Sequence, residues 1–262
     1  MTRTVQQLFD LQGRTALITG GSRGLGLQIA QGLGEAGARV FISSRKAEEL
    51  EHASAQLRAQ GIDAHWFAAD CQKEAEIHQL AEAAFEQLGQ VDILVNNAGA
   101  SWGAAAEDHP IPGWDKVMNL NVRSYFILSQ HIARASMIPR KRGRIINTAS
   151  IAGLGGNPPG MKTLAYNTSK GAVITFTQAL ACEWGGYGIN VNAICPGVFP
   201  TKMSAGLLDT LGPTYLDHVP LHRVGDDEDL KGLAVLLASD AGKHITGQWL
   251  AVDGGVSALA GG

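Results

Sequence analysis

The chain has 262 residues, 45% of them hydrophobic, which is enough to bury a sizeable core within one α/β unit. A formal net charge of −3 gives no reason to expect nucleic acid as a partner. The three cysteines lie far apart and suggest neither a disulfide framework nor a metal site. We find no signal peptide and no uninterrupted apolar run of membrane-spanning length. We therefore expect a cytoplasmic protein that binds no metal and no membrane.

Apolar runs typical of strands alternate with helical patterns from the N-terminus onward. Strands are expected at 15–18, 40–43, 65–68, 92–95, 144–148, 190–194 and 249–252, and helices at 25–33, 48–60, 77–88, 114–135, 164–184 and 226–237. In the third helix, apolar residues at 77, 80, 81, 84, 85 and 88 share one helical face. Pro139 and the basic residues 140–142 predict a turn. Acidic residues from Asp226 onward suit the start of the last helix, where the helix dipole favours them.

Repeated β-α-β units predict a parallel sheet with helices on both faces. Because such crossovers are right-handed, the sheet should be doubly wound. We therefore expect an α/β fold of the Rossmann type, with seven parallel strands, in a single domain that spans residues 1–262. In such a sheet, ligands bind beyond the carboxyl ends of the strands, where the strand order reverses. Gly20, Asp70, Asn96 and Ser150 all follow predicted strands and should lie at that edge.

A glycine-rich turn, Thr19 to Gly26, joins the first strand to the first helix. Glycine allows positive φ angles and lets a ligand approach the backbone closely. The free N–H groups of the first helical turn suit a pyrophosphate. The spacing, T-G-x-x-x-G-x-G, is a variant of the usual dinucleotide fingerprint. Its place between a strand and a helix predicts a dinucleotide cradle.

Tyr166 and Lys170 form the second informative motif, four residues apart near the start of a predicted helix. This spacing places both side chains on one helical face. A nearby ammonium favours the phenolate and is expected to lower the pKa of Tyr166. Such a pair can exchange a proton with a carbonyl or carbinol oxygen. The motif follows Ser150, which ends a predicted strand.

Taken together, these motifs resemble the short-chain dehydrogenase/reductase family over essentially the whole chain. The matching residues, in order, are Thr19, Gly20, Gly24, Gly26, Asp70, Asn96, Asn97, Ala98, Gly99, Asn121, Ser150, Tyr166, Lys170, Pro196 and Gly197.

The resemblance implies a catalytic set. Tyr166 would act as the general acid in reduction and as the base in oxidation. Lys170 would hold the nicotinamide ribose and depress the pKa of Tyr166. Ser150 would orient and polarise the substrate oxygen, and Asn121 would anchor a water that links Lys170 to solvent.

The resemblance also implies a cofactor site. Asn96 and Gly99 would line the cofactor, Asp70 with Cys71 would flank the adenine, and the loop after Pro196 would close on the nicotinamide. The complete set of implied cofactor contacts is Gly20, Ser22, Arg23, Gly24, Leu25, Gly26, Ser44, Arg45, Asp70, Cys71, Asn97, Ala98, Gly99, Tyr166, Lys170, Pro196, Gly197, Val198 and Thr201.

The end of the second strand predicts NADP(H) rather than NAD(H). An acidic residue there would bind the adenosine ribose 2′-hydroxyl, whereas arginine accommodates a 2′-phosphate. Here Ser44 takes the place of the acidic residue and Arg45 follows it. Arg23 of the glycine turn is expected to face the same region.

Two features concern the substrate site and assembly. The segment 202–223 is an apolar-rich insertion that we expect to act as a lid over a small-molecule substrate, and the loop 155–162 should shape the site entrance. The resemblance implies a homotetramer, assembled through the helices at 114–135 and 164–184. A second interface would use the C-terminal strand and tail, 249–259.

A narrower resemblance concerns the substrate. The stretches 101–105, 113–114 and 116–118 resemble 3-oxoacyl-thioester reductases of the rhamnolipid-synthesis type. This favours reduction of a ketone or a 3-oxoacyl group, with Trp102 serving either as a pocket wall or as a packing residue. Two alternatives stay open: a sugar or sugar-acid dehydrogenase of the gluconate type, and a cofactor-binding sensor without turnover.

Overall fold

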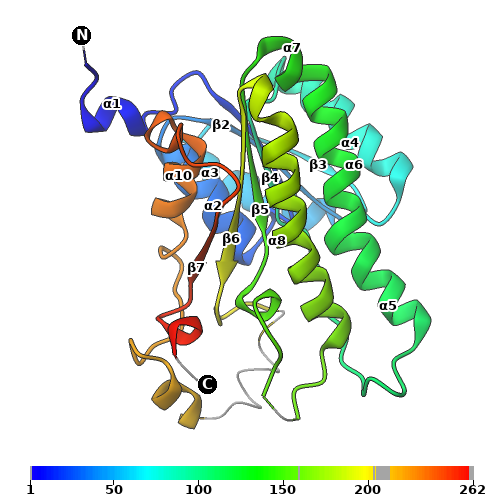
Figure 1. The fold of residues 1–262 in the computed structure, drawn as a ribbon. Coiled ribbons are helices and arrows are strands. Elements are labelled where there is room, and N and C mark those ends of the chain that lie inside the picture. The colour runs from blue at the N-terminus through cyan, green and yellow to red at the C-terminus, as the bar shows by residue number, and fades with distance from the viewer. Residues whose placement is uncertain (1, 159, 203, 205–212, 260–262) are drawn as a thin grey trace.

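In the computed structural model, which describes residues 2–158, 160–202, 204 and 213–259, seven strands form one sheet in the order β3-β2-β1-β4-β5-β6-β7 (Figure 1). Every neighbouring pair is parallel. The strands are β1 (Thr15–Thr19), β2 (Arg39–Ser44), β3 (Ala64–Ala68), β4 (Ile93–Asn96), β5 (Gly143–Thr148), β6 (Ile189–Pro196) and β7 (Trp249–Val252). After β3 the chain returns to the other side of β1. The predicted doubly wound parallel sheet of seven strands is confirmed.

Helices cover both faces of the sheet. The principal ones are α2 (Gly24–Glu35), α3 (Ala47–Ala59), α4 (Glu74–Leu88), α5 (Ile111–Met118), α6 (Ser124–Ile132), α8 (Leu164–Trp184) and α10 (Lys231–Ala238). The alternation of side chains along β1 divides the core. Ala16 and Ile18 pack with α2, α3 and α10, whereas Leu17 faces α4 and α6. No helix in the described part of the chain is long and apolar enough to cross a membrane.

The helix predicted at 114–135 is longer and less regular than expected. Helical backbone runs from Ile111 to Arg140, through α5, α6 and α7 (Ile138–Arg140), with π-helical turns at Asn119–Arg123 and Ala133–Met137. Pro139 lies inside α7 rather than in a turn, near the end of this helical run and directly after the second π-helical turn. The chain turns at Lys141 instead, which has a left-handed φ of 49°.

The helix predicted at 226–237 begins later, at Lys231. Asp226 Oδ1 accepts the Glu228 N–H at 2.9 Å, and Asp229 Oδ2 accepts the Asp226 N–H at 2.9 Å. These carboxylates bind backbone groups in a turn and so compete with helix formation. A short helix that we did not predict, α1 (Val5–Phe9), is held by a capping box between Thr4 and Gln7.

Residues 203 and 205–212 of the predicted lid, 202–223, lie outside the described residues. Of its described part, residues 213–218 form a 3-10 turn. The lid therefore stays a prediction.

Candidate active site

The glycine turn after β1 is closely packed and leaves little space for side chains. Gly20 has a φ of +66° and Gly24 a φ of +54°, which favour glycine. A Cβ on Gly20 would come within 2.8 Å of Asn97 Nδ2. That amide donates to the carbonyls of Thr19 at 3.0 Å and Gly20 at 3.2 Å, and so fixes the turn to the end of β4. Gly26 packs directly against the Gly20 carbonyl, in the first helical turn of α2.

The end of β2 fits a ligand with hydrogen-bonding groups. The hydroxyls of Ser43 and Ser44 are both buried, and neither has a hydrogen-bond partner among the described residues. Buried polar groups are otherwise almost always satisfied. Arg45 is exposed beside them. Arg23 Nη1 forms an ion pair with Glu49 Oε2 at 2.7 Å, across the gap between the glycine turn and α3. Ser43 is 0% exposed and points to the opposite face of β2 from Ser44. The Ser44 hydroxyl and the glycine cradle fit the ribose and phosphates of NADP(H).

The loop after β6 approaches the same cradle. A Cβ on Gly24 would come within 3.2 Å of the Thr201 side chain. The Gly197 N–H donates to the Val252 carbonyl at 2.9 Å, and the Val198 carbonyl accepts the Gly225 N–H at 2.9 Å. The segment that begins at Pro196 is thus held between β7 and the chain before α10, next to the glycine turn.

Asp70 and Cys71 follow β3. Asp70 Oδ1 accepts the Gln72 N–H at 3.1 Å, and the Asp70 N–H donates to Glu76 Oε2 at 2.7 Å. Burial raises the pKa of the Cys71 thiol to about 12, so this cysteine stays protonated.

Asn96 does not line the predicted cofactor site, contrary to our expectation. Its side chain is only 1% exposed, and Nδ2 donates to Ser129 Oγ at 3.0 Å and to Asn147 Oδ1 at 2.9 Å. Because side chains alternate along a strand, Asn96 faces the interior while the next residue, Asn97, reaches the ligand edge. The Thr19 hydroxyl accepts the N–H groups of Asn97 at 3.0 Å and Ala98 at 3.1 Å.

Ser150 and Tyr166 are brought together by contacts between the chain after β5 and the start of α8. Ser150 precedes a 3-10 turn, Ile151–Gly153, and its Oγ accepts the Ala152 N–H at 3.2 Å. A Cβ on Gly153 would come within 2.7 Å of the α8 backbone at Gly171. Asn167 Nδ2 donates to the Ala152 carbonyl at 2.8 Å. Gly153 and Asn167, which hold the Ser150 turn against α8, were not predicted from the sequence.

The pKa values of Tyr166 and Lys170 differ in part from expectation. Burial raises the pKa of Tyr166, against an opposing hydrogen bond from Ser150. Burial outweighs the lowering expected from Lys170, whose ammonium is itself buried and donates to the Thr148 carbonyl at 2.6 Å. The Lys170 Nζ lies 5.6 Å from the Tyr166 ring centroid. Burial lowers the pKa of Lys170 to about 8.

Asn121 lies in the first π-helical turn, a distortion that often marks functional sites. Its Oδ1 accepts the Ala100 N–H at 2.8 Å and its Nδ2 donates to the Ala100 carbonyl at 2.9 Å. Nδ2 also donates to Ser169 Oγ at 2.9 Å, and Ser169 Oγ donates to the Tyr166 carbonyl at 2.7 Å. Asn121 therefore joins the loop after β4 to the helix that carries Tyr166. Ser169, which completes this connection, was not predicted.

Gly99 lies between the predicted cofactor site and the predicted catalytic residues. A Cβ there would come within 3.3 Å of Asn121 Oδ1 and 3.8 Å of Lys170 Nζ. A protonated phenol, an ammonium and a serine hydroxyl thus gather at the carboxyl edge of the sheet, beside the glycine cradle. This set can donate a proton to a carbonyl oxygen placed between Ser150 and Tyr166. The described residues contain no group of three side chains that could hold a metal.

Comparison with known proteins finds matches over most of the chain. A family model described as short chain dehydrogenase matches residues 14–211. The chain is 44% identical over 252 residues to a rhamnolipids biosynthesis 3-oxoacyl-[acyl-carrier-protein] reductase from Pseudomonas aeruginosa, covering 94% of this chain and 97% of the relative.

Two solved structures share the fold. A complex of RhlG with NADP from Pseudomonas aeruginosa has a TM-score of 0.88 and 43% identity, covering 96% of this chain and 99% of the other. A gluconate 5-dehydrogenase from Burkholderia cenocepacia, bound to NADP and tartrate, has a TM-score of 0.92 and 34% identity, covering 98% and 100%.

Proposed function

The chain belongs to the short-chain dehydrogenase family, and from this premise we propose that it is an NADP(H)-dependent oxidoreductase that reduces a ketone or a 3-oxoacyl group. The observation that carries the proposal is the meeting of Ser150, Tyr166 and Lys170 beside the glycine turn. A sensor that only bound the cofactor would have no need of this set.

NADPH, when bound in the glycine cradle, supplies the hydride for the substrate carbonyl carbon. Ser150 donates a hydrogen bond to the substrate oxygen and holds it beside the phenol. Tyr166 gives its proton to that oxygen as the alcohol forms. Lys170 carries a positive charge at the base of the site and favours the phenolate that is left behind. Asn121 holds the loop after β4 and the first turns of α8 in register.

The raised pKa of Tyr166 keeps its phenol protonated, which is the form that donates a proton in reduction. A phenol that is protonated at neutral pH is already in the form a general acid needs. Oxidation would need the phenolate, which burial disfavours.

The preference for NADP(H) is supported by charge at the end of β2. Arg45 is exposed at the end of β2, and Arg23 of the glycine turn faces α3 beside it. Ser44 stands at the position where an acidic residue would bind the ribose of NAD(H). Both guanidinium groups can bind a 2′-phosphate through paired hydrogen bonds.

The surroundings of the site support an apolar substrate. The loop after Ala100 runs beside the start of α8 through a bridge between Ala104 and Thr163. Trp102 in this loop packs against Gly113 and remains 37% exposed. Leu154 follows the Ser150 turn and is also exposed. Two such side chains suit an acyl chain better than a sugar acid, which is the second candidate because of the gluconate 5-dehydrogenase likeness.

A substrate panel tests the proposal. Oxidation of NADPH is followed by absorbance with 3-oxoacyl thioesters, simple ketones and 5-ketogluconate, and with Tyr166→Phe as the control. Preferred turnover of a thioester or ketone supports the proposal, whereas preference for 5-ketogluconate supports the sugar-acid candidate. Cofactor binding without turnover of any compound would favour the sensor.

We further propose that the enzyme is a cytoplasmic homotetramer. All three cysteines are free thiols, as is usual in a reducing compartment. Exposed apolar side chains on α6, α8 and β7, among them Phe126, Leu164 and Trp249, provide surfaces that a second copy could cover.

A further inference from the structure

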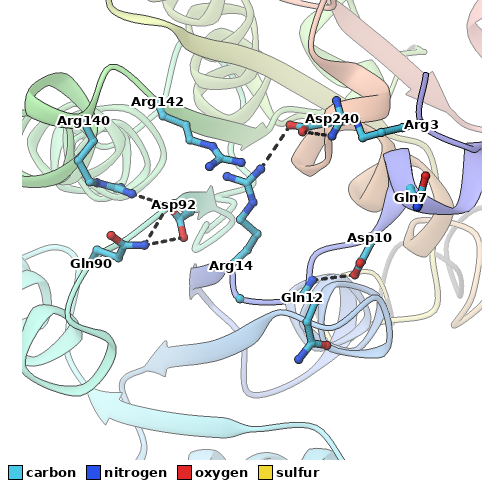
Figure 2. A pocket seen from close by; sticks show the side chains of 11 residues that line it. Arg3, Gln7, Asp10, Gln12, Arg14, Gln90, Asp92, Arg140, Arg142 and Asp240 are labelled. Atoms are coloured by element: carbon cyan, nitrogen blue, oxygen red, sulfur yellow. Dashed lines mark hydrogen bonds and ion pairs between the residues drawn. The ribbon is translucent and has the colours of Figure 1, made fainter. Parts of the chain in front are cut away.

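A polar cavity of about 550 Å³ lies at the edge of the sheet opposite the glycine turn (Figure 2). Its walls include Arg14, Asp92 and Arg142, which come directly before β1, β4 and β5, and therefore stand at the amino ends of these strands. Six residues of extended chain, about 20 Å, separate Arg14 from Gly20. The cavity is thus distinct from the site of the proposed hydride transfer.

Positive charge in this region exceeds the negative charge that faces it. The Asp240 carboxylate lies 2.6 Å from Arg3 Nη1, 3.3 Å from Arg14 Nη2 and 3.5 Å from Arg144 Nη2. One carboxylate therefore serves three guanidinium groups. Arg142 forms no ion pair with any residue that the structure describes, and Figure 2 shows its guanidinium reaching toward that of Arg14.

The other acids of the cavity are already occupied. Asp92 accepts Arg140 Nη1 at 2.5 Å and the Thr15 N–H at 3.1 Å. Asp10 accepts the Gln12 N–H at 2.8 Å. Neither acid pairs with Arg142 within the described part of the chain, so the excess charge around Asp240 is not balanced by the cavity itself.

Arg144, one of the three arginines around Asp240, has an N–H group without a hydrogen-bond partner among the described residues. This group is the buried Nε. Burial lowers the pKa of Arg144 against the opposing charge of Asp240, and the charge of Arg14 lowers it further. An added anion would relieve both the repulsion between these groups and the cost of burying them.

The lining defines the kind of anion. All eleven residues around the cavity are polar, charged or glycine, with no aromatic or large apolar side chain to receive a base or an acyl chain. Guanidinium groups bind phosphate through paired hydrogen bonds. The amides of Gln7, Gln12 and Gln90 can exchange hydrogen bonds with hydroxyl groups. The volume falls within the range of small-molecule sites.

We propose that this cavity binds a small, hydroxylated phosphate monoester, of the sugar phosphate class, with its phosphate between Arg14 and Arg142. The site does not depend on the proposed oxidoreductase activity, since it shares no residue with the catalytic set. No aromatic or large apolar side chain in the lining favours the base of a nucleotide over the hydroxyl groups of a sugar.

Calorimetric titration with glucose 6-phosphate at low ionic strength tests the proposal. NADP⁺ is kept saturating, so that the phosphate cannot enter the cofactor site, and unphosphorylated glucose is the control ligand. We expect binding of glucose 6-phosphate only. Arg142→Gln should weaken it by about tenfold or more, because a hydrogen-bonded charge is lost. Lys141→Gln removes a neighbouring exposed charge outside the lining and should change binding by less than about twofold.

Three outcomes would overturn the proposal. They are no binding at millimolar concentrations, equal binding of glucose, and equal weakening by the two variants. Arg142 is exposed, so its substitution should leave the fold intact; the unfolding temperature and the NADPH affinity of the variant check this. Loss of catalytic activity in some other variant would test only the proposed function, whereas this titration tests only the cavity.

Discussion

At the scale of single residues, the phenol of Tyr166 is the group whose chemistry can be isolated most cleanly. Tyr166→Phe removes one oxygen and keeps the ring, so folding and NADPH affinity should be unchanged. The turnover rate should fall by about 10²–10⁴-fold, the usual contribution of a positioned acid. Tyr187→Phe removes an exposed hydroxyl elsewhere and should have no effect. Turnover near the wild-type rate in Tyr166→Phe would exclude the phenol as the proton donor.

Lys170 gives the reaction a specific pH dependence. Its pKa is lowered to about 8 by burial, so the side chain is charged below pH 8 and becomes neutral above it. Because the charge favours the phenolate, kcat/KM for reduction should be level below pH 8 and then fall by up to about tenfold per pH unit.

The variant Lys170→Arg distinguishes this titration from others. A guanidinium keeps its proton throughout this range, so the fall above pH 8 should disappear even if the maximal rate is lower. A fall at the same pH in the arginine variant would assign the titration to another group.

Glu49 should influence the choice of cofactor although it lies outside the predicted contacts. In the protein alone it holds Arg23 at 2.7 Å, and Lys46 approaches it at 3.2 Å. A bound 2′-phosphate must compete with this carboxylate for Arg23. Glu49→Gln should therefore raise the ratio of NADPH to NADH affinity by about two- to fivefold, the range of a partly exposed ion pair.

Glu48→Gln is the matched control, because Glu48 is exposed in the same helical turn and forms no ion pair within the described residues. Fluorescence titration with NADPH and with NADH would give the dissociation constants of the wild type and of both variants. A lower ratio in Glu49→Gln would mean that the carboxylate positions Arg23 for the phosphate instead of competing with it.

At the scale of elements, the sequence predicted all seven strands, because buried parallel strands are short, strongly apolar runs. It predicted side-chain direction less well. Asn96 and Asn97 both follow an apolar run, and only the strand's exact end decides which of them faces the ligand edge. The late start of α10 has a local cause, a carboxylate turn, that composition does not reveal.

The site was predictable where motifs carry it and unpredictable where distant segments meet. Tyr166 and Lys170 are recognisable from their spacing once Ser150 at a strand end and the glycine turn are read with them. Gly153, Asn167 and Ser169 act through contacts with residues far along the chain, such as Asn121, and no local pattern marks them.

A buried polar chain links the central strands to α6 and α8 and should contribute strongly to stability. Asn147 accepts from Asn96 at 2.9 Å and donates to Thr177 Oγ1 at 2.9 Å, and all three side chains are fully or almost fully buried. Asn147→Ala should reduce the free energy of unfolding by about 2–4 kcal/mol, since it leaves a cavity and unsatisfied partners.

Denaturant unfolding would measure this loss. Asn190→Ala is the control, because Asn190 also donates two hydrogen bonds but lies at the partly exposed rim, where water can replace it. Equal losses in the two variants would show that burial of the polar chain adds nothing.

At the scale of the whole molecule, the reversal of strand order between β1 and β4 explains why one edge carries the chemistry. The chain leaves β1 and β4 in opposite directions there, and this is where doubly wound sheets bind their ligands. The glycine turn, Asn97 and Ser150 all follow strands that end at this edge. The amino ends of the same strands, at the opposite edge, form the arginine-lined cavity instead (Figure 2).

The same whole-molecule view predicts how copies assemble. Phe126 on α6 is 49% exposed and Leu164 on α8 is 46% exposed, while Trp249 on the edge strand β7 is 42% exposed. Large apolar side chains on an edge strand and on two neighbouring helices are costly to leave in water. If they form two separate interfaces, a tetramer of four 27.6 kDa chains results.

A single glutamate introduced into each interface should disrupt that interface and leave the other intact. Phe126→Glu and Trp249→Glu should each convert the tetramer to a dimer, and the double variant should be a monomer, because a buried unpaired carboxylate opposes association. Val5→Glu introduces the same charge at a 65% exposed position on α1 and should leave the tetramer intact. Light scattering after size exclusion would give the masses. A monomeric wild type, or tetramers in both single variants, would contradict the proposed assembly.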